Sequence, residues 1–209
     1  MFSILTPIAK LSSKLPLVEL RWSVMGDRLP ADHNYRLYSA LIERSPALKD
    51  VAWQLGTIAG TPDREGWIRI GSESSLTVRC ALEDLGWFDR LDRQVLRVGR
   101  SVLRLGEMTG GTIQPCLRLR SRIVTIKANY RGQVSPFEFG VALGKQLADR
   151  SIRSVPILGD RMALRIKDKN IVGYAVAFEN LSPHESIMLQ TEGLGGRRRM
   201  GCGVFRHDG

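Results

Sequence analysis

The sequence predicts an α+β protein made of two tandem ferredoxin-like domains, each with the element order βαββαβ. Three observations predict it: the first half of the chain shows strand and helix patterns in that order, the second half repeats the order, and Met108–Thr112 joins the halves with small, flexible residues. At 209 residues with 43% hydrophobic content, the chain is long enough to build both cores. We expect domains at 1–110 and 111–209.

The first half opens with a strand and a helix. Apolar and polar residues alternate through Leu17–Met25, which is typical of a half-buried strand, and Pro30–Asp32 resembles a helix start. That helix should end before Pro46, because proline cannot continue it. Two short strand-like segments, Trp67–Ile70 and Leu76–Arg79, follow around Gly-Ser-Glu-Ser and predict a hairpin.

The rest of the first half completes the pattern with a short helix over Ala81–Phe88 and a strand pair at Val95–Val98 and Val102–Leu105. The second half follows the same order. It predicts, in turn, a strand within Leu117–Lys127, a helix over Phe137–Arg150 after Pro136, a strand pair at Arg161–Lys167 and Ile171–Glu179, a helix over Pro183–Gln190 and a last strand at Gly201–Phe205.

Charge points to a polyanionic partner. Thirty-one Lys and Arg against 21 Asp and Glu give a net charge of +10, which favours nucleic acid; an acidic membrane surface is the competing explanation. Charges interrupt every hydrophobic stretch, so no membrane-spanning helix is predicted. The first ten residues lack the features of a secretory signal, and three widely spaced cysteines fit neither a disulfide framework nor a zinc site. We expect a cytoplasmic protein with reduced thiols.

The segment from Gly193 to Phe205 combines glycines with three consecutive arginines. Glycines let the backbone approach a ligand, free amides in such a turn can bind an anion, and the arginines attract phosphate. A plain turn with solvated arginines is the alternative interpretation. The residues that we expect to contact the phosphate-bearing partner are Gly193, Gly195, Gly196, Arg197, Arg198, Arg199, Gly201 and Gly203.

Among three histidines, His33 has the position best suited to acid–base chemistry. It falls in the first turn of the first predicted helix, where the positive end of the helix dipole attracts phosphate and disfavours an imidazolium. Arg36 lies three residues on and could bind developing negative charge, and Tyr38 could supply a hydroxyl. The alternatives are a solvent-facing first-turn histidine and a core-packing Tyr35 and Tyr38.

No metal or cofactor site is predicted, since the sequence has no His-x-x-x-His pair, no paired cysteines and no carboxylate cluster. A nuclease without metal can still cut RNA, because the 2′-hydroxyl is a nucleophile next to the phosphate, whereas DNA has none. The expected substrate is therefore RNA. Four further basic residues, placed by alternation on predicted strands, are candidate RNA contacts or parts of a solvated sheet face: Arg118, Arg120, Lys127 and Lys167.

Two motifs resemble a known family. The chain from Asp27 to Tyr38, with its proline-acid-histidine helix start, and the Gly-rich segment before the last strand resemble the CRISPR-associated repeat-processing endoribonucleases of type I systems, in the myxobacterial (MYXAN) subgroup of the repeat-associated RNA-binding superfamily. Val124–Lys127 and Ile171–Tyr174 add to the likeness, which covers nearly the whole chain.

The resemblance implies two ferredoxin-like domains facing one another across a cleft and metal-independent cleavage of the precursor transcript at a repeat hairpin. The 2′-hydroxyl would attack the adjacent phosphate and leave a 2′,3′-cyclic phosphate, with His33 as general acid or base and the Gly-rich segment holding the RNA. The implied partners are stem-loop repeat RNA, mature crRNA and the other subunits of a type I interference complex.

Two other functions remain as alternatives. One is a non-catalytic guide-RNA-binding subunit of a CRISPR effector complex, in which His33 is incidental. The other takes the Gly-rich segment as a nucleotide loop, but that signature needs a strand before it and a helix after it, and the predicted order here is reversed.

Overall fold

The computed structural model describes residues 17–126 and 134–207. The first half contains β1 (Leu17–Met25), β2 (Arg28–Pro30), α1 (Asn34–Arg44), β3 (Trp53–Leu55), β4 (Thr61–Pro62), β5 (Trp67–Arg69), β6 (Ser75–Ala81), β7 (Val95–Val98) and β8 (Ser101–Thr112). Three 3₁₀ turns complete it, namely η1 (Pro46–Lys49), η2 (Leu82–Trp87) and η3 (Asp89–Leu91). The second half contains β9 (Leu119–Val124), α2 (Pro136–Ala148), β10 (Ile157–Ile166), β11 (Lys169–Phe178), α3 (Pro183–Glu192), η4 (Arg198–Met200) and β12 (Arg206–His207).

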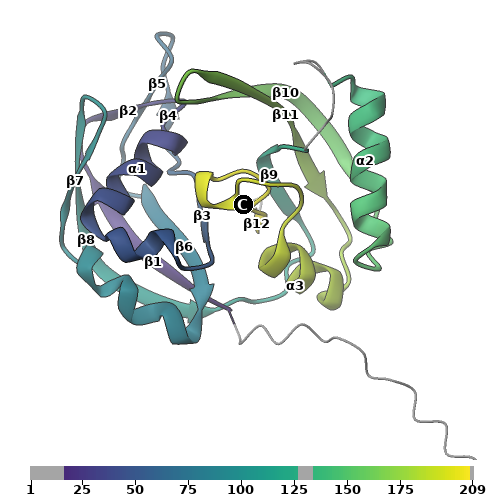
Figure 1. Cartoon of the computed structure of the whole chain (residues 1–209), viewed down its shortest axis with the longest axis horizontal. Helices are drawn as coiled ribbons and strands as arrows, with labels where there is room; N and C mark the ends of the chain where they lie inside the picture. Colours follow the sequence, from purple (N-terminus) through teal and green to yellow (C-terminus); the bar gives the residue numbers. More distant parts are fainter. Residues whose placement is uncertain (1–16, 127–133, 208–209) are drawn as a thin grey trace, which may run out of the picture.

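Each half is built on one antiparallel sheet, and the two sheets have matching strand orders (Figure 1). The first sheet runs β3-β6-β1-β8-β7 and the second runs β10-β11-β9-β12. In the first sheet β1 lies between β6 and β8, and in the second sheet β9 lies between β11 and β12. This is the arrangement of a βαββαβ unit, in which the first strand lies between the third and the fourth; β7 is an additional strand at one edge of the first sheet. The predicted fold class, two tandem ferredoxin-like units, is confirmed.

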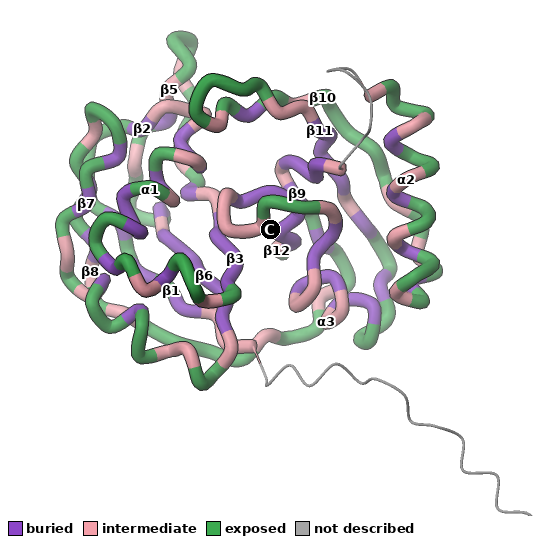
Figure 2. The backbone as a smooth tube through the Cα atoms, in the orientation of Figure 1, coloured by how far each residue is buried: buried purple, intermediate pink, exposed green. Residues whose placement is uncertain are grey.

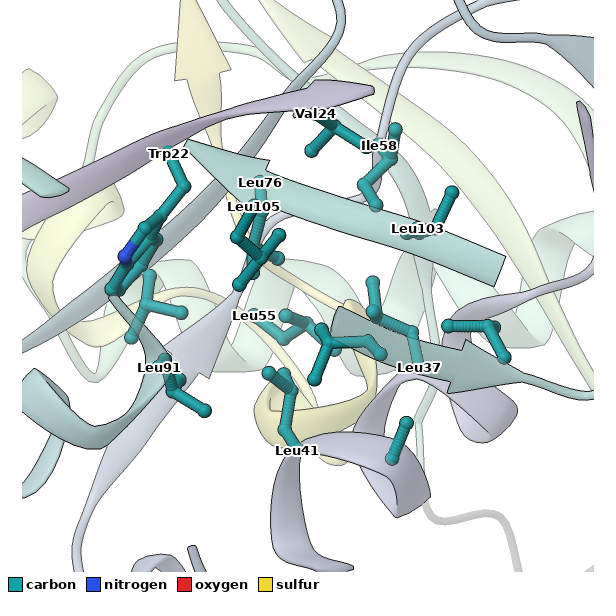
Figure 3. Close-up of a cluster of buried hydrophobic side chains, with 14 of the residues drawn as sticks. Trp22, Val24, Leu37, Leu41, Leu55, Ile58, Leu76, Leu91, Leu103 and Leu105 are labelled. Carbon is teal, nitrogen blue, oxygen red and sulfur yellow. The ribbon is translucent and has the colours of Figure 1, made fainter. Parts of the chain in front are cut away.

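Alternation along β1 places one face of the first sheet in the core. Trp22 and Val24 are buried while the residues beside them in sequence are exposed. Helix α1 covers this face with Leu37 and Leu41, which point toward the side chains of the strands (Figure 3). The same helix therefore packs into the core with one side and carries its N-terminal residues to the edge of the sheet.

The helices of the second half begin where the sequence places a capping box. Ser135 accepts a hydrogen bond from the Glu138 backbone amide at 3.2 Å, and the Glu138 carboxylate accepts one from the Ser135 amide at 2.9 Å. Ser182 and Glu185 make the same exchange at the start of α3. Serine three residues before glutamate, with proline after the serine, predicts such starts from sequence. No described helix combines the length and apolar character that crossing a bilayer requires.

Four expectations for individual elements are wrong. Ala81–Phe88 forms 3₁₀ turns in place of a helix. Strands β5 and β6 exist but do not pair, because β5 joins β2 and β4 in a separate three-stranded sheet. Gly201–Phe205 is irregular, and the last strand is the two-residue β12. Met108–Thr112 is not a joint: these residues continue β8 against β1, so the chain leaves the first sheet only after Thr112.

A buried arginine connects the halves. Arg79 on β6 donates from Nη1 to the carbonyl oxygens of Gln190 at 3.1 Å and Phe205 at 2.5 Å, both in the second half. Its Nε donates to the Glu19 carboxylate at 2.8 Å. Desolvation by burial lowers the pKa of Arg79, and Glu19 partly offsets that cost. The two domains are thus held together by a charged group that neither half can satisfy alone.

Replacing Arg79 by Met is expected to lower the free energy of unfolding by about 3 kcal/mol, because it leaves Glu19 and two carbonyl oxygens without their donor. Urea denaturation measures the change. Arg97→Met, at an exposed position on β7, is the control and should change stability by less than about 0.5 kcal/mol. Equal stability of the two variants would show that the Arg79 contacts do not hold the halves together.

Candidate RNA-cleavage site

His33 is fully buried at the start of α1, which contradicts the alternative interpretation of a solvent-facing first-turn histidine. Its Nδ1 lies 2.9 Å from the carbonyl oxygen of Pro30. Because a carbonyl only accepts, Nδ1 carries the proton in the neutral ring and Nε2 keeps its lone pair. Nε2 has no hydrogen-bond partner among the described residues. The imidazole therefore has one ring nitrogen anchored and the other available as a proton acceptor.

The surroundings of His33 favour its neutral form. Desolvation by burial lowers its pKa from 6.5 to about 4; the Pro30 hydrogen bond raises it, Arg122 lowers it further, and Asp32 raises it. At neutral pH the ring is uncharged. That state suits a general base, which must be unprotonated when it receives a proton.

Acidification is expected to destabilise the protein through His33. The unfolded chain binds a proton below pH 6.5, whereas the folded chain does so only near pH 4, so stability falls as the pH decreases through that window. At pH 5 the loss amounts to on the order of 2 kcal/mol. Urea denaturation at pH 7 and pH 5 measures it, with His33→Gln as the comparison. If the variant loses as much stability as the wild-type protein, His33 is not the group responsible.

A cleft of about 840 Å³ runs past His33 between the two halves. Among the described residues lining it, the charged ones are five arginines and one glutamate: Arg21, Arg79, Arg120, Arg122, Arg206 and Glu19. They come from β1 and β6 of the first half and from β9 and β12 of the second. A concave, strongly basic surface of this kind favours a polyanion such as RNA.

The Gly-rich loop, Gly193–Gly203, lies between the two halves (Figure 1). It has an exposed stretch around Gly196 and Arg197 between two buried ones (Figure 2). Gly203 has φ +65°, and a Cβ there would overlap the carbonyl oxygen of Leu194. Only glycine combines that backbone conformation with that close approach.

Most backbone amides of this loop donate hydrogen bonds to other protein groups, so the expectation that they are free to bind an anion is wrong for them. Gly195 donates to the Gln146 side chain at 2.8 Å, and Gly203 donates to the Ile123 carbonyl at 2.7 Å. The other amides with protein acceptors are those of Gly193, Leu194, Gly196, Met200, Gly201 and Cys202. The glycines give the loop its shape, and the arginines carry its charge.

The loop contacts the start of α1 directly. The Asn34 side-chain amide donates to the carbonyl oxygen of Met200 and to the hydroxyl of Thr57, both at 3.0 Å. Gly201, with φ +73°, leaves room for that amide and lines the cleft with His33. Residues from opposite ends of the sequence thus form one wall of the site.

The other two residues predicted for catalysis lie apart from the cleft. Arg36 is exposed, with its side chain beside Gly99 in the β7–β8 turn. Tyr38 stacks on Trp53 with ring centroids 6.0 Å apart and faces a second pocket, of about 550 Å³. Neither lines the cleft with His33, because they lie on other sides of α1.

The predicted RNA-binding arginines also face that second pocket. Arg197 is exposed, Arg198 donates to the carbonyl oxygen of Glu192, and Arg199 donates to that of Lys49 at 2.6 Å. Arg197 also donates to the Thr125 hydroxyl at 3.4 Å, so all three arginines contribute to the position of the loop as well as to its charge.

The basic residues predicted from strand alternation lie in different parts of the structure. Arg120 lines the cleft. Arg118 is exposed and lies 3.8 Å from the Glu179 carboxylate, and Lys167 occupies the exposed β10–β11 turn. Lys127 lies outside the described residues. Arg122, which is not among the predicted site residues, lines the cleft beside His33. Its position two residues after Arg120 on the same strand is the sequence signal that indicates this placement.

Within the described residues, no group of three or more His, Cys, Asp or Glu side chains has an arrangement that could hold a metal ion. Cys202 is a buried residue of the Gly-rich loop, and desolvation raises the pKa of its thiol to about 11. It is therefore a thiol at neutral pH and a poor nucleophile.

Comparisons with known proteins agree on one family. The family model described as Cas6 Crispr matches residues 18–208. A CRISPR-associated endonuclease Cas6 from Myxococcus xanthus strain DK1622 is 30% identical over 190 residues, which cover 90% of this chain and 80% of that protein.

Solved structures show the same fold at low sequence identity. A Cas6-related protein from Pyrococcus furiosus matches with TM-score 0.64 and 13% identity, covering 91% of this chain and 98% of that one. A protein described as a RAMP protein binding different RNA substrates matches with TM-score 0.65 and 14% identity over the same shares. The CRISPR endoribonuclease Cse3 bound to a 19-nucleotide RNA matches with TM-score 0.55 and 12% identity, again over those shares.

Proposed function

Because the chain belongs to the Cas6 family of CRISPR-associated proteins, we propose that it is an endoribonuclease that cuts CRISPR precursor RNA within its repeats to give mature crRNA. The observation that carries the proposal is a neutral histidine, whose Nε2 has no partner among residues 17–126 and 134–207, beside a cleft lined by five arginines. The Myxococcus relative is named an endonuclease, and the Cse3 structure holds RNA, which supports RNA as the substrate class.

The proposed reaction needs no metal. His33 Nε2 accepts the proton of the 2′-hydroxyl, the O2′–P bond forms, and the P–O5′ bond breaks. The departing 5′ oxygen takes a proton from water, which leaves a 2′,3′-cyclic phosphate and a 5′-hydroxyl. The arginines of the cleft offset the charge that grows on the phosphate oxygens. Since His33 is shielded from solvent, RNA binding must open a path to Nε2.

The two halves have different roles in this proposal. The N-terminal domain supplies His33, and the C-terminal domain supplies the Gly-rich loop and the β9 arginines. The substrate is stem-loop repeat RNA in the cytoplasm, and the cut crRNA stays bound for assembly with other subunits of a type I interference complex.

The alternative is a subunit that binds guide RNA without cutting it, and the complete burial of His33 is the observation that favours it. Incubation with repeat RNA in the presence of EDTA separates the two. We expect cleavage into a 2′,3′-cyclic phosphate product. RNA that binds tightly and stays intact would establish the non-catalytic subunit and reject the enzyme.

A further inference from the structure

Arg122 lies in the middle of β9 and lines the cleft together with His33. Arg120 is two residues away, so both side chains project from the same face of the strand. The next residue along β9, Ile123, accepts the Gly203 amide at 2.7 Å, which holds the Gly-rich loop against this part of the strand. The position of Arg122 is therefore set by the sheet on one side and by the loop on the other.

The Arg122 guanidinium differs from other cleft arginines in its contacts. Arg79 bonds to Glu19 and two carbonyl oxygens, and Arg206 donates to the Thr57 carbonyl at 3.1 Å. The Arg122 guanidinium makes no hydrogen bond or ion pair with any residue in 17–126 or 134–207. The charge that acts on it most strongly is the carboxylate of Asp32, whose Oδ2 accepts the Arg165 amide at 2.8 Å.

A half-buried cation without a hydrogen-bonding partner is unfavourable in the free protein. Desolvation is the main influence on Arg122 and lowers its pKa. A phosphate entering the cleft would supply the missing acceptor, and a guanidinium can bind two of its oxygens at once. His33, whose Nε2 has no hydrogen-bond partner among the described residues, lines the same cleft.

We propose that Arg122 binds the scissile phosphate and holds it beside His33 Nε2. This inference rests on the proposed function and assigns the residue that touches the reacting group. Arg122 binds the nonbridging oxygens, whose negative charge grows as the O2′–P bond forms, so its effect is larger in the transition state than in the bound substrate. Its charge also disfavours protonation of His33 and so preserves the base.

The kinetic test compares Arg122→Gln with Arg118→Gln, which removes the same charge from an exposed residue outside the cleft. We expect Arg122→Gln to lower the single-turnover cleavage rate about 100-fold, as loss of one charge-stabilising donor does. Binding of a repeat RNA with 2′-deoxyribose at the cleavage site should weaken less than about 10-fold. Arg118→Gln should stay within about threefold of wild type in both measurements. An Arg122→Gln rate close to wild type would overturn the proposal.

An NMR titration of His33 in the RNA-free protein provides a readout that needs no activity. Removing the nearby cation should raise the pKa of His33 in Arg122→Gln and leave it unchanged in Arg118→Gln. An unchanged pKa of His33 in Arg122→Gln would show that Arg122 does not lie near His33 and would overturn the inference. If the wild-type protein cuts no RNA while the pKa rises as expected, the proposed function fails and the electrostatic contact stands.

Discussion

Replacing His33 by Ala is expected to lower the single-turnover cleavage rate of repeat RNA by about 1,000-fold, the typical contribution of a positioned acid–base group. His33 is the proposed base because its Nδ1 is anchored and its Nε2 has no partner among the described residues, and no described histidine in the cleft other than His207 could replace it. His207 is exposed and lies at the end of β12, on another element. Rates are measured with end-labelled RNA in EDTA.

His184→Ala is the matched control, because His184 is exposed at the start of α3 and does not line the cleft. It should cut at the wild-type rate. Binding of repeat RNA by His33→Ala should stay within a few-fold of wild type, since phosphate contacts supply most of the affinity. A His33→Ala rate within about 10-fold of wild type would show that another group is the base.

Replacing Gly203 by Ala is expected to lower the free energy of unfolding by about 4 kcal/mol. The new Cβ would overlap the Leu194 carbonyl oxygen at a backbone angle of φ +65°, so both overpacking and left-handed strain oppose folding. The Gly203–Ile123 hydrogen bond that holds the loop on β9 would be displaced as well. RNA cleavage should fall with it, since Gly201 and Arg122 line the cleft on either side of this contact.

Gly196→Ala is the control in the same loop, because it removes a glycine without introducing a steric overlap. A Cβ at Gly196 meets no atom within 4 Å, and its φ is not in the left-handed range. Its stability should remain within about 0.5 kcal/mol of wild type. Urea denaturation of both variants decides the matter: equal losses would mean that the loop needs glycine for flexibility and not for close packing.

The elements with strong local signals were predictable. Alternation in Leu17–Met25 matches β1 residue for residue, and the serine-glutamate spacing marks the starts of α2 and α3. The pairing of Trp67–Arg69 was not predictable in this way. A strand pattern reports which face is buried but not which neighbour supplies its hydrogen bonds. The sequence therefore predicts that β5 pairs with β6, whereas in the structure β5 pairs with β2 and β4.

The site was predictable only in part, because local patterns identify single residues and segments but not the contacts between distant parts of the chain. His33 stands out because few residues titrate near neutral pH, and the Gly-rich loop stands out by composition. Their contact through Asn34 and Met200 joins residues far apart in the chain, which no local pattern encodes. Strand alternation predicts Arg118 and Arg120 as candidates and does not single out Arg122, and only the packing of the second half against the first shows that Arg122 and not Arg118 lies beside His33.

The most direct test of cleavage by 2′-hydroxyl attack at His33 is a product analysis in EDTA, using repeat RNA from the same genomic locus with and without one 2′-deoxyribose at the cleavage site. We expect the all-ribose RNA to yield a 2′,3′-cyclic phosphate and a 5′-hydroxyl, and the substituted RNA to bind and remain intact. Cleavage of the substituted RNA at the same position, or a product with a 5′-phosphate, would contradict the mechanism.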